Sequence, residues 1–217
     1  MARTGRPRQF DPLEATDAAL RLFWQYGYES TSVAQLRGAM GISVASFYAA
    51  FSSKDQLFDA VVQRYLSTFG QVTAIATDQD LPPREAVERT LRQSVHMQTD
   101  PSHPSGCLVA LAETTGASEN QRVRDLLADR RAWDRRNIEA CVERGVVLGD
   151  LSAGTDAGAL AAVFHSFLLG VSTQARDGLP AETLDAAVTH VMRVWDSARA
   201  GHNGQDPGRC SGRGPDR

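Results

Sequence analysis

The sequence predicts an all-α fold of about nine helices, arranged as a small N-terminal domain followed by a larger helical one. Apolar residues recur at helical spacing along most of the chain, and no run alternates with the two-residue period of a half-buried strand. Several segments start with a residue that can cap a helix, followed by Glu or Gln three positions later. The composition, with 42% hydrophobic and 23% charged residues, is ordinary for a soluble globular protein.

Four helices are expected between residue 11 and about residue 69. Asp11 can cap the first of them, Pro12 suits its first turn, and Glu14 stands at the capping-box position. Gly27 and Gly41 follow the first two helices, where a residue with positive φ ends a helix at low cost. The four expected helices are Asp11–Tyr26, Ser32–Met40, Ser43–Ala50 and a long one from Ser53 to about Phe69.

Five more helices are expected beyond residue 80, separated by segments that contain Pro and Gly. They cover about residues 83–98, 107–115, 120–144, 155–175 and 180–199. Residues 201–217 hold five glycines and two prolines with almost no apolar side chain, so we expect a disordered tail. Residues 1–9 are expected to form a flexible basic arm. The two expected domains therefore cover residues 10–57 and 58–200.

The charge of the chain is unevenly distributed. Three arginines and no acidic residue lie in the first eight positions, so the rest of the chain is more acidic than the net charge of −3. A basic arm on an acidic body favours local contact with nucleic acid over a uniformly basic coat. Lys54 is the only lysine of the sequence.

Several classes of protein are not expected. The cysteines Cys107, Cys141 and Cys210 form no CxxC pair, which argues against a disulfide framework and a structural metal site. No metal-ligand spacing or glycine-rich phosphate loop is found, and no cofactor is expected. No apolar run approaches the roughly 18 residues of a membrane span, and no apolar stretch follows the N-terminal arginines as in a signal peptide. A cytoplasmic protein without a membrane partner is therefore expected.

Two short expected helices joined by a glycine turn predict a helix-turn-helix. The first helix is Ser32–Met40, the turn is Gly41-Ile42, and the second helix is Ser43–Ala50. The second helix of such a unit enters the major groove of DNA. Residues 10–57 are thus expected to form an N-terminal three-helix DNA-binding domain, which the long fourth helix holds in place.

A longer pattern surrounds this unit. It reads Gly27-Tyr28-x-x-Thr31-Ser32, then Gly41-Ile42-Ser43-Val44-Ala45-Ser46-Phe47-Tyr48-x-x-Phe51-x-Ser53-Lys54-Asp55-x-Leu57. Together with the lead-in Gly5-Arg6-Pro7-Arg8 and Phe10-Asp11, it resembles the N-terminal signature of the TetR family over about residues 3–58. The resemblance implies a homodimeric transcriptional repressor that binds a pseudo-palindromic double-stranded operator and is released by a small-molecule effector. An activator of the same family is the alternative.

Ten residues are predicted to contact DNA. Ser43 can cap the recognition helix, and Val44 and Ala45 are small apolar residues that suit thymine methyl groups, unless they only face solvent. The resemblance implies phosphate contacts from Tyr48 and Lys54. The predicted contacts are Arg6, Arg8, Thr31, Ser32, Ser43, Val44, Ala45, Ser46, Tyr48 and Lys54.

Three further residues of this domain have other expected roles. Phe47 and Phe51 are expected to pack in the core. Ala50 stands where the TetR family often has a large residue that touches the DNA backbone, so its presence implies fewer phosphate contacts.

Past residue 58, the resemblance implies a helical domain that binds the effector and dimerises through the last two helices. Small residues crowd the expected helix 155–175, which allows the close approach of a second helix. The effector pocket is expected between the fourth helix and the middle helices, with plain core packing as the alternative for each residue. The predicted lining residues are Tyr65, Phe69, Met97, Cys107, Leu111, Trp133, Phe164, His165 and Phe167.

Cys107 opens an expected apolar helix, in a segment Ser105-Gly106-Cys107-Leu108 that is similar to electrophile-responsive members of the family. A helix N-terminus stabilises a thiolate, so a lowered pKa is expected for Cys107, which would suit a sensor. Packing is the alternative role. An all-helical enzyme with this cysteine as nucleophile is a competing function, and it would need His96 or His103 as its base. A structural DNA binder is disfavoured, because about 150 residues follow the DNA-binding domain.

Overall fold

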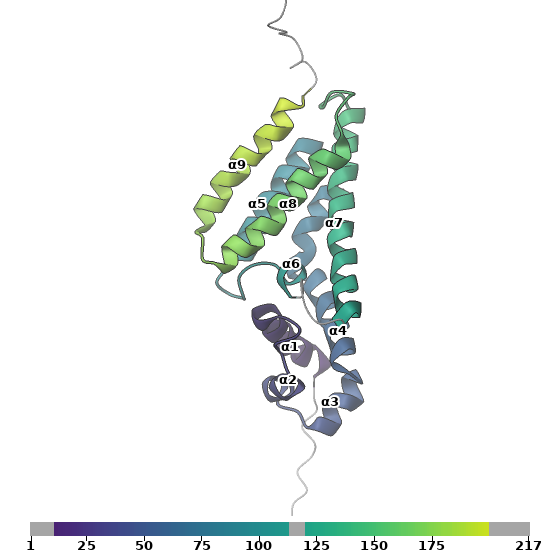
Figure 1. Cartoon of the computed structure of the whole chain (residues 1–217), viewed down its shortest axis with the longest axis vertical. Coiled ribbons are helices and arrows are strands. Elements are labelled where there is room, and N and C mark those ends of the chain that lie inside the picture. Colours follow the sequence, from purple (N-terminus) through teal and green to yellow (C-terminus); the bar gives the residue numbers. More distant parts are fainter. Residues whose placement is uncertain (1–10, 113–119, 200–217) are drawn as a thin grey trace, which may run out of the picture.

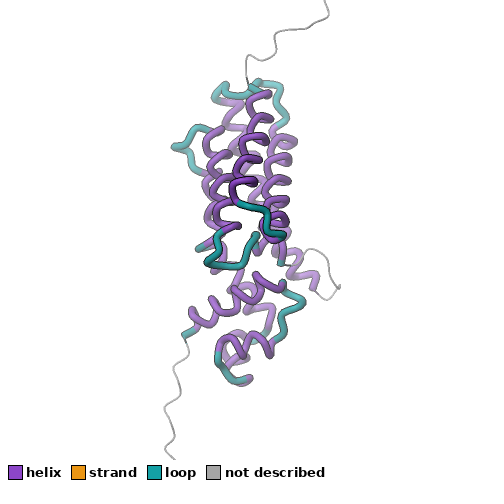
Figure 2. The backbone as a smooth tube through the Cα atoms, turned by 90° about the vertical axis from the view of Figure 1, so that its left-hand side faces the viewer, coloured by secondary structure: helices purple, strands orange, loops and turns teal. Residues whose placement is uncertain are grey.

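The computed structural model describes residues 11–112 and 120–199. Within these ranges the chain forms ten helical segments and no strand, so the all-α prediction is confirmed (Figures 1 and 2). The helices are α1 Pro12–Tyr26, α2 Val33–Met40, α3 Val44–Phe51, α4 Lys54–Leu66, the 3₁₀ helix η1 Phe69–Thr77, α5 Pro83–Thr99, α6 Leu108–Leu111, α7 Gln121–Val147, α8 Ala157–Arg176 and α9 Ala181–Ser197. The expected arm with Arg6 and Arg8, and the expected tail with Cys210, lie outside the described residues.

The first four helices begin where their capping residues predict. The Asp11 carboxylate accepts a hydrogen bond from the Leu13 N–H at 2.8 Å, and Ser32 forms a complete capping box with Gln35. The Ser43 and Ser53 hydroxyls likewise accept hydrogen bonds from backbone N–H groups of the first turns of α3 and α4. Local chemistry thus sets these helix starts.

The fourth helix ends earlier than predicted. It stops at Leu66, and the chain continues as the 3₁₀ helix η1. The Ser67 and Thr68 hydroxyls both donate to the Arg64 carbonyl, at 3.0 and 2.7 Å. Such side-chain bonds compete with the helical backbone pattern. Gly70 then lies so close to Tyr65 that a Cβ there would be 3.0 Å from the ring, which fixes the tight turn.

The C-terminal helices form a bundle in which α8 packs on α7 and α5, and α9 packs on α5 and α8. In Figure 1 the long α7 runs along one side of this bundle and α9 along the other, with the helix-turn-helix at the far end. A core of buried side chains joins the four helices, among them Leu91, Val142, Phe164 and Trp195. The bundle therefore has its own hydrophobic core.

A second core crosses the expected domain boundary at residue 57. It includes Phe23 of α1, Phe47 of α3 and Phe58 of α4, together with Leu108 of α6 and Leu127 of α7. Helix α4 runs through the same boundary without a break. The N-terminal helices and the adjoining end of the bundle therefore share one core.

Helix α8 is the one described helix that is long and apolar enough to cross a membrane by length and composition. This is a weak indication, since a core helix of a soluble protein passes the same test. Its residues Leu160, Phe164 and Leu168 are buried against the other helices of the bundle.

Candidate functional site

The helix-turn-helix is closed by a glycine turn. Gly41 has φ 66°, a left-handed conformation, and its N–H bonds to the carbonyls that end α2. The Ile42 N–H donates to the Arg37 carbonyl at 3.2 Å, which completes the helix end. The chain can therefore turn within the three residues 41–43 between α2 and α3.

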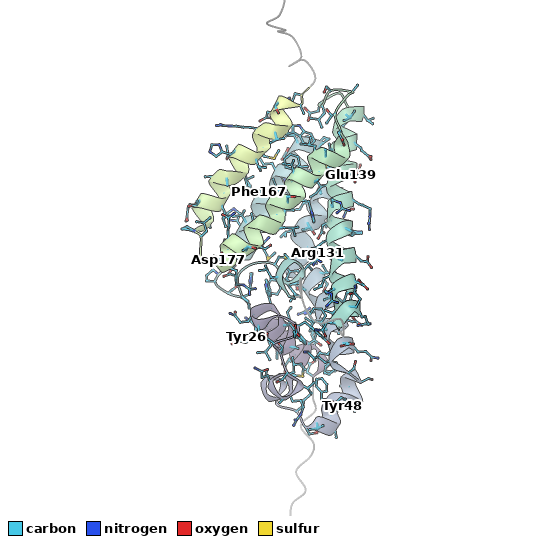
Figure 3. All side chains as sticks on the ribbon, in the orientation of Figure 1. Tyr26, Tyr48, Arg131, Glu139, Phe167 and Asp177 are labelled. Carbon is cyan, nitrogen blue, oxygen red and sulfur yellow. The ribbon has the colours of Figure 1, made fainter. Side chains whose placement is uncertain are left out.

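Helix α3 presents an uncharged, exposed surface at one end of the molecule. Val44 is 49% exposed and Tyr48 is 50% exposed, while Phe47 is fully buried and packs edge-on against the Tyr48 ring at 5.3 Å. Figure 3 shows Tyr48 at the end farthest from α9. Ala45 and Ala50 are exposed as well. The core position predicted for Phe47 is confirmed, and Phe51, half-buried, packs on the same core.

The predicted DNA contact of Thr31 needs correction. Its side chain is only 1% exposed, and its hydroxyl donates to the Gly27 carbonyl at 2.7 Å. Thr31 therefore holds the end of α1 and leaves no hydroxyl for a phosphate. Ser32 is exposed and engaged in the capping box, and the Ser43 and Ser46 hydroxyls lie 2.9 Å apart.

Lys54 lies beside the recognition helix at the start of α4. Its Nζ sits 4.1 Å above the centre of the Tyr28 ring, and the Tyr28 hydroxyl donates to the Asp55 carboxylate. These contacts fix the orientation of the lysine at the edge of the α3 surface.

A small cavity of about 40 Å³ lies between α4, η1, α5, the 107–110 segment, α7 and α8. Its walls combine apolar groups with several buried polar ones. They are Tyr65, Leu66, Gly70, Val72, Thr73, Ser94, Met97, Gln98, Cys107, Val109, Ala110, Arg131, Asp134, His165, Leu168, Leu169 and Ser172. We call this space the central cavity.

Four of the nine predicted pocket residues line the central cavity, namely Tyr65, Met97, Cys107 and His165. The other five do not. Phe69 lines a separate cavity and packs on Trp24, at a ring distance of 5.0 Å. The remaining predicted residues face elsewhere for reasons of packing, since Phe164 and Phe167 join the bundle core, Trp133 stacks under the Arg130 guanidinium at 3.8 Å, and Leu111 lies against Gly106.

Sequence reasoning missed the polar walls of the central cavity. Ser94 and Gln98 are one helical turn apart on α5, and Arg131 and Asp134 come from α7. A signal was present in the sequence, because Ser94 and Gln98 continue from Thr90 at four-residue spacing beside the apolar Leu91 and Val95. Polar residues at core-facing positions of an amphipathic helix indicate a site or a buried network.

The environment of Cys107 differs from the prediction. The Tyr65 hydroxyl donates to its Sγ at 3.2 Å. Burial raises the pKa of the Cys107 thiol above its ordinary value, and this outweighs the opposing hydrogen bonds from Tyr65, Ala110 and Val109. The predicted lowering of the pKa is wrong, because α6 has only four residues and contributes little dipole. Cys107 is therefore a protonated thiol at neutral pH.

Two other groups in the walls are uncharged at neutral pH. Burial raises the pKa of the Tyr65 phenol well above its ordinary value. Burial, together with the Arg135 and Arg131 guanidiniums, lowers the pKa of His165. The cavity thus has a neutral thiol, a neutral phenol and a neutral imidazole beside the half-buried Arg131.

The segment Gly106–Ala112 connects the central cavity to α1. The Trp24 indole N–H donates to the Gly106 carbonyl at 3.0 Å, and the Tyr28 N–H donates to the Ala112 carbonyl at 2.9 Å. The Trp24 ring also packs edge-on against Tyr65 at 4.9 Å. A change in the cavity wall therefore has direct contacts through which it reaches the first helix.

Arg176, the last residue of α8, bonds to three backbone carbonyls. Its Nε donates to Ser105 at 2.9 Å, while Nη2 and Nη1 donate to Trp24 and Gln25 at 2.9 and 3.2 Å. Trp24 and Gln25 lie in the last turn of α1, where carbonyls lack helical partners. One guanidinium thus joins the end of α8, the end of α1 and the loop before Cys107.

The outer face of α8 and α9 exposes apolar side chains. Val163 is 42% exposed and Val194 is 39% exposed. Other apolar residues of α8 and α9 are buried inside the chain, because they pack in the bundle core. These are Ala161, Leu184, Val188 and Trp195.

Comparisons with known proteins match the N-terminal and the C-terminal helices of this chain separately. A family model described as bacterial regulatory proteins, tetR family, matches residues 15–61, and one described as tetracyclin repressor-like, C-terminal domain, matches residues 83–193. The HTH-type transcriptional repressor ComR of Escherichia coli (strain K12) is 31% identical over 195 residues, which are 88% of this chain and 91% of ComR. BdcR, a repressor of the same strain, is 36% identical over 105 residues, which are 48% of this chain and 53% of BdcR.

A solved structure of the TetR family transcriptional regulator CifR is similar over most of the chain. It is a cysteine mutant of CifR complexed with 26-bp double-strand operator DNA. It is 40% identical in sequence, with a TM-score of 0.82, and the match covers 88% of this chain and 100% of that one.

Proposed function

Because this chain belongs to the TetR family of bacterial regulatory proteins, we propose that it is a repressor that binds a pseudo-palindromic operator as a homodimer and leaves it when a small molecule enters the central cavity. The observation that carries the proposal is the exposed, uncharged face of α3 at the end of the molecule, joined through one core to the cavity walls. ComR and BdcR are repressors by name, and CifR is complexed with operator DNA in its solved structure, which supports the same role here.

The exposed face of α3 suits recognition of DNA base edges by small side chains. Val44 and Ala45 offer methyl groups for thymine, and Ser46 offers a hydroxyl. Helix α3 carries no charge, so phosphate contacts must come from its rim, where Tyr48 and Lys54 lie. The same base and phosphate contacts are expected from each subunit of a homodimer bound to two half-sites.

Removal of the Tyr48 hydroxyl is expected to weaken binding of the homodimer to DNA at least about a hundredfold, because a hydrogen bond to a charged phosphate contributes about 1.5–3 kcal/mol at each of the two half-sites. The loss should be similar for a duplex enriched from a random pool and for a scrambled duplex, because a phosphate contact carries no sequence information. The measurement is fluorescence anisotropy with Tyr48→Phe at fixed salt. Unmodified protein should bind the enriched duplex at least about 10³-fold more tightly than the scrambled one.

Tyr26→Phe is the matched control, because Tyr26 is equally exposed, at 57%, but lies at the end of α1 away from α3 (Figure 3). It should bind like the unmodified protein. Equal affinities of the unmodified protein for the enriched and the scrambled duplex would overturn the proposed function. Equal effects of Tyr48→Phe and Tyr26→Phe would show that Tyr48 does not contact DNA.

Release of the repressor from its operator is proposed to begin at the wall of the central cavity. A molecule in the cavity displaces Tyr65 or the segment Gly106–Ala112, which contact Trp24 and Tyr28. Movement of α1 and α4 then changes the spacing of the two recognition helices in the dimer. The exposed apolar side chains of α8 and α9 are the proposed dimer surface. A cytoplasmic location is proposed because the chain belongs to a family of bacterial regulatory proteins that bind DNA.

Alkylation of Cys107 by iodoacetamide is expected to weaken operator binding at least tenfold, because the new carbamidomethyl group has to enter the wall of a cavity of about 40 Å³. The thiolate forms the S–C bond and iodide leaves. Because the pKa of Cys107 is raised, the thiolate fraction and the alkylation rate should rise about tenfold from pH 7 to pH 8. The facing groups Tyr65, Arg131, Asp134 and His165 do not oppose this rise, since the pKa of Tyr65 is raised and that of His165 is lowered.

The measurement couples peptide mass spectrometry of Cys107 to anisotropy on the enriched duplex. Cys107→Ser keeps the other two cysteines and serves as the control. If this variant loses operator affinity as fast as the unmodified protein, Cys107 is not the release site. An alkylation rate that does not change with pH would contradict the raised pKa.

An enzymatic role is the weaker candidate. His103 stacks on the Trp24 ring at 4.5 Å and lines another cavity, and His96 is exposed. Neither of the two histidines considered as bases lies in the wall that holds Cys107, and His165 is the histidine that does. A sensing role for Cys107 is proposed because the relatives of this chain are repressors by name.

A further inference from the structure

A stripe of polar side chains runs along the buried face of α5. Thr90, Ser94 and Gln98 follow one another at four-residue spacing and are 0%, 1% and 3% exposed. The Thr90 hydroxyl donates to the Ala86 carbonyl at 2.8 Å. In contrast, the Ser94 Oγ and the Gln98 Oε1 have no hydrogen-bond partner among the residues that the structure describes.

Both unpartnered oxygens belong to walls of the central cavity, whereas Thr90 does not line it. A buried polar atom without a partner is costly to the folded state, so a molecule that supplies a hydrogen bond to it is favoured there. The Ser172 hydroxyl, in the α8 wall, is already bonded to the Leu168 carbonyl at 3.2 Å. The Asp134 Oδ1 of α7 also accepts no hydrogen bond, but its charge is paired with Arg130. The uncharged groups of the wall with free hydrogen-bonding capacity are therefore Ser94 and Gln98 of α5.

The charges around the cavity disfavour a cationic guest. Arg131 points a guanidinium into this region and bonds to the Val109 carbonyl at 2.7 Å. The Asp134 carboxylate is already paired with Arg130 at 3.2 Å. No unpaired acid among the described wall residues would balance an ammonium group.

The size of the cavity limits the guest further. About 40 Å³ is available, and one water needs about 10–15 Å³ of the same kind of volume. The cavity thus holds only a few heavy atoms without rearrangement. A guest of that size that reaches Ser94 and Gln98 also lies near Cys107, since all three residues line the same small space.

We propose that Ser94 and Gln98 form the recognition site for the head group of the effector, and that this head group is uncharged and carries a hydrogen-bond donor, such as a primary amide or a hydroxyl. The effector is a compact electrophile whose reactive carbon faces Cys107. The inference rests on the proposed function, in which the central cavity receives the effector.

Two isosteric probes test this site. Acrylamide and methyl vinyl ketone each have five heavy atoms, a carbonyl and a terminal alkene, and they differ only in an NH₂ or a CH₃ group. The Cys107 thiolate forms an S–C bond to the terminal carbon, the π electrons move to the neighbouring carbon, and that carbon takes a proton from water. The rate at Cys107 is followed by mass spectrometry, and each rate is divided by that of free glutathione with the same reagent.

The normalised rate for acrylamide should exceed that for methyl vinyl ketone about tenfold, since one net hydrogen bond is worth up to about that factor. The preference should fall to about one in the double variant Ser94→Ala, Gln98→Met. Thr90→Val is the matched control, because it removes a buried hydroxyl of the same stripe that does not line the cavity, and it should keep the preference.

A second measurement does not depend on variants. Propanamide should slow the reaction of Cys107 with methyl vinyl ketone, whereas its isostere butan-2-one should not. Three outcomes would each overturn the proposal and indicate ordinary hydration of Ser94 and Gln98. They are equal normalised rates for acrylamide and methyl vinyl ketone in the unmodified protein, a preference for acrylamide that survives in the double variant, and equal protection of Cys107 by propanamide and butan-2-one. Reaction with neither reagent would also overturn it. A clear preference without loss of operator binding would instead contradict the proposed function alone.

Discussion

Gly106→Ala is expected to lower the free energy of unfolding by about 2–4 kcal/mol, from left-handed strain and overpacking together. Gly106 has φ 81°, a conformation that L side chains rarely adopt. An added Cβ would lie 2.6 Å from the Leu111 Cδ1 and 2.7 Å from the Ser172 carbonyl oxygen. The Ser172 backbone belongs to α8 and cannot move aside as a flexible side chain would. Urea unfolding at a fixed protein concentration measures the loss.

Gly149→Ala separates the two causes. Gly149 has a nearly equal φ of 77°, but a Cβ there would meet nothing within 4 Å. It should lose only about 1 kcal/mol, the cost of the left-handed backbone alone. Equal losses in the two variants would contradict the close approach of Gly106 to α8.

Arg176→Met is expected to lower the free energy of unfolding by about 2 kcal/mol, because three carbonyls lose a charged donor and water replaces it only in part. The same variant should respond less to alkylation of Cys107, since α8 is no longer tied to Trp24, Gln25 and Ser105. The two measurements are urea unfolding and the loss of operator affinity after treatment with iodoacetamide.

Arg176→Lys is the conservative control. An ammonium keeps the charge but cannot span three carbonyls as a planar guanidinium does. It should restore less than half of the lost stability. If Met and Lys at this position both behave like arginine, the three hydrogen bonds do not couple α8 to α1.

The sequence was most informative where structure depends on near neighbours. The starts of the first four helices follow from Asp11, Ser32, Ser43 and Ser53, each of which bonds to a backbone N–H of its own first turn. Phe47 was predicted to be buried, and the spacing within one short helix was sufficient for this. These features need no knowledge of distant segments.

The residues that line the central cavity could not be predicted in full, because they depend on contacts between distant segments of the chain. Phe164 and His165 are neighbours on α8, yet the first packs into the bundle core and the second lines the cavity. An aromatic at helical spacing therefore says that a residue is buried, but not what lies beside it. Likewise, burial raises the pKa of Cys107, and this effect outweighs the hydrogen bond from Tyr65 and the helix start that suggested a lowered pKa.

The shared core restricts how this protein can be recombined. Phe23, Phe47 and Phe58 belong to one core with Leu108 and Leu127, which lie far downstream in the chain. A fragment that ends at residue 57 would lose the downstream part of this core, and a graft of a foreign DNA-binding domain onto this body would have to reproduce the shapes that pack there. Exchange of operator specificity is therefore simplest on the outer face of α3, where Val44, Ala45 and Ser46 can be replaced without disturbing a partner helix.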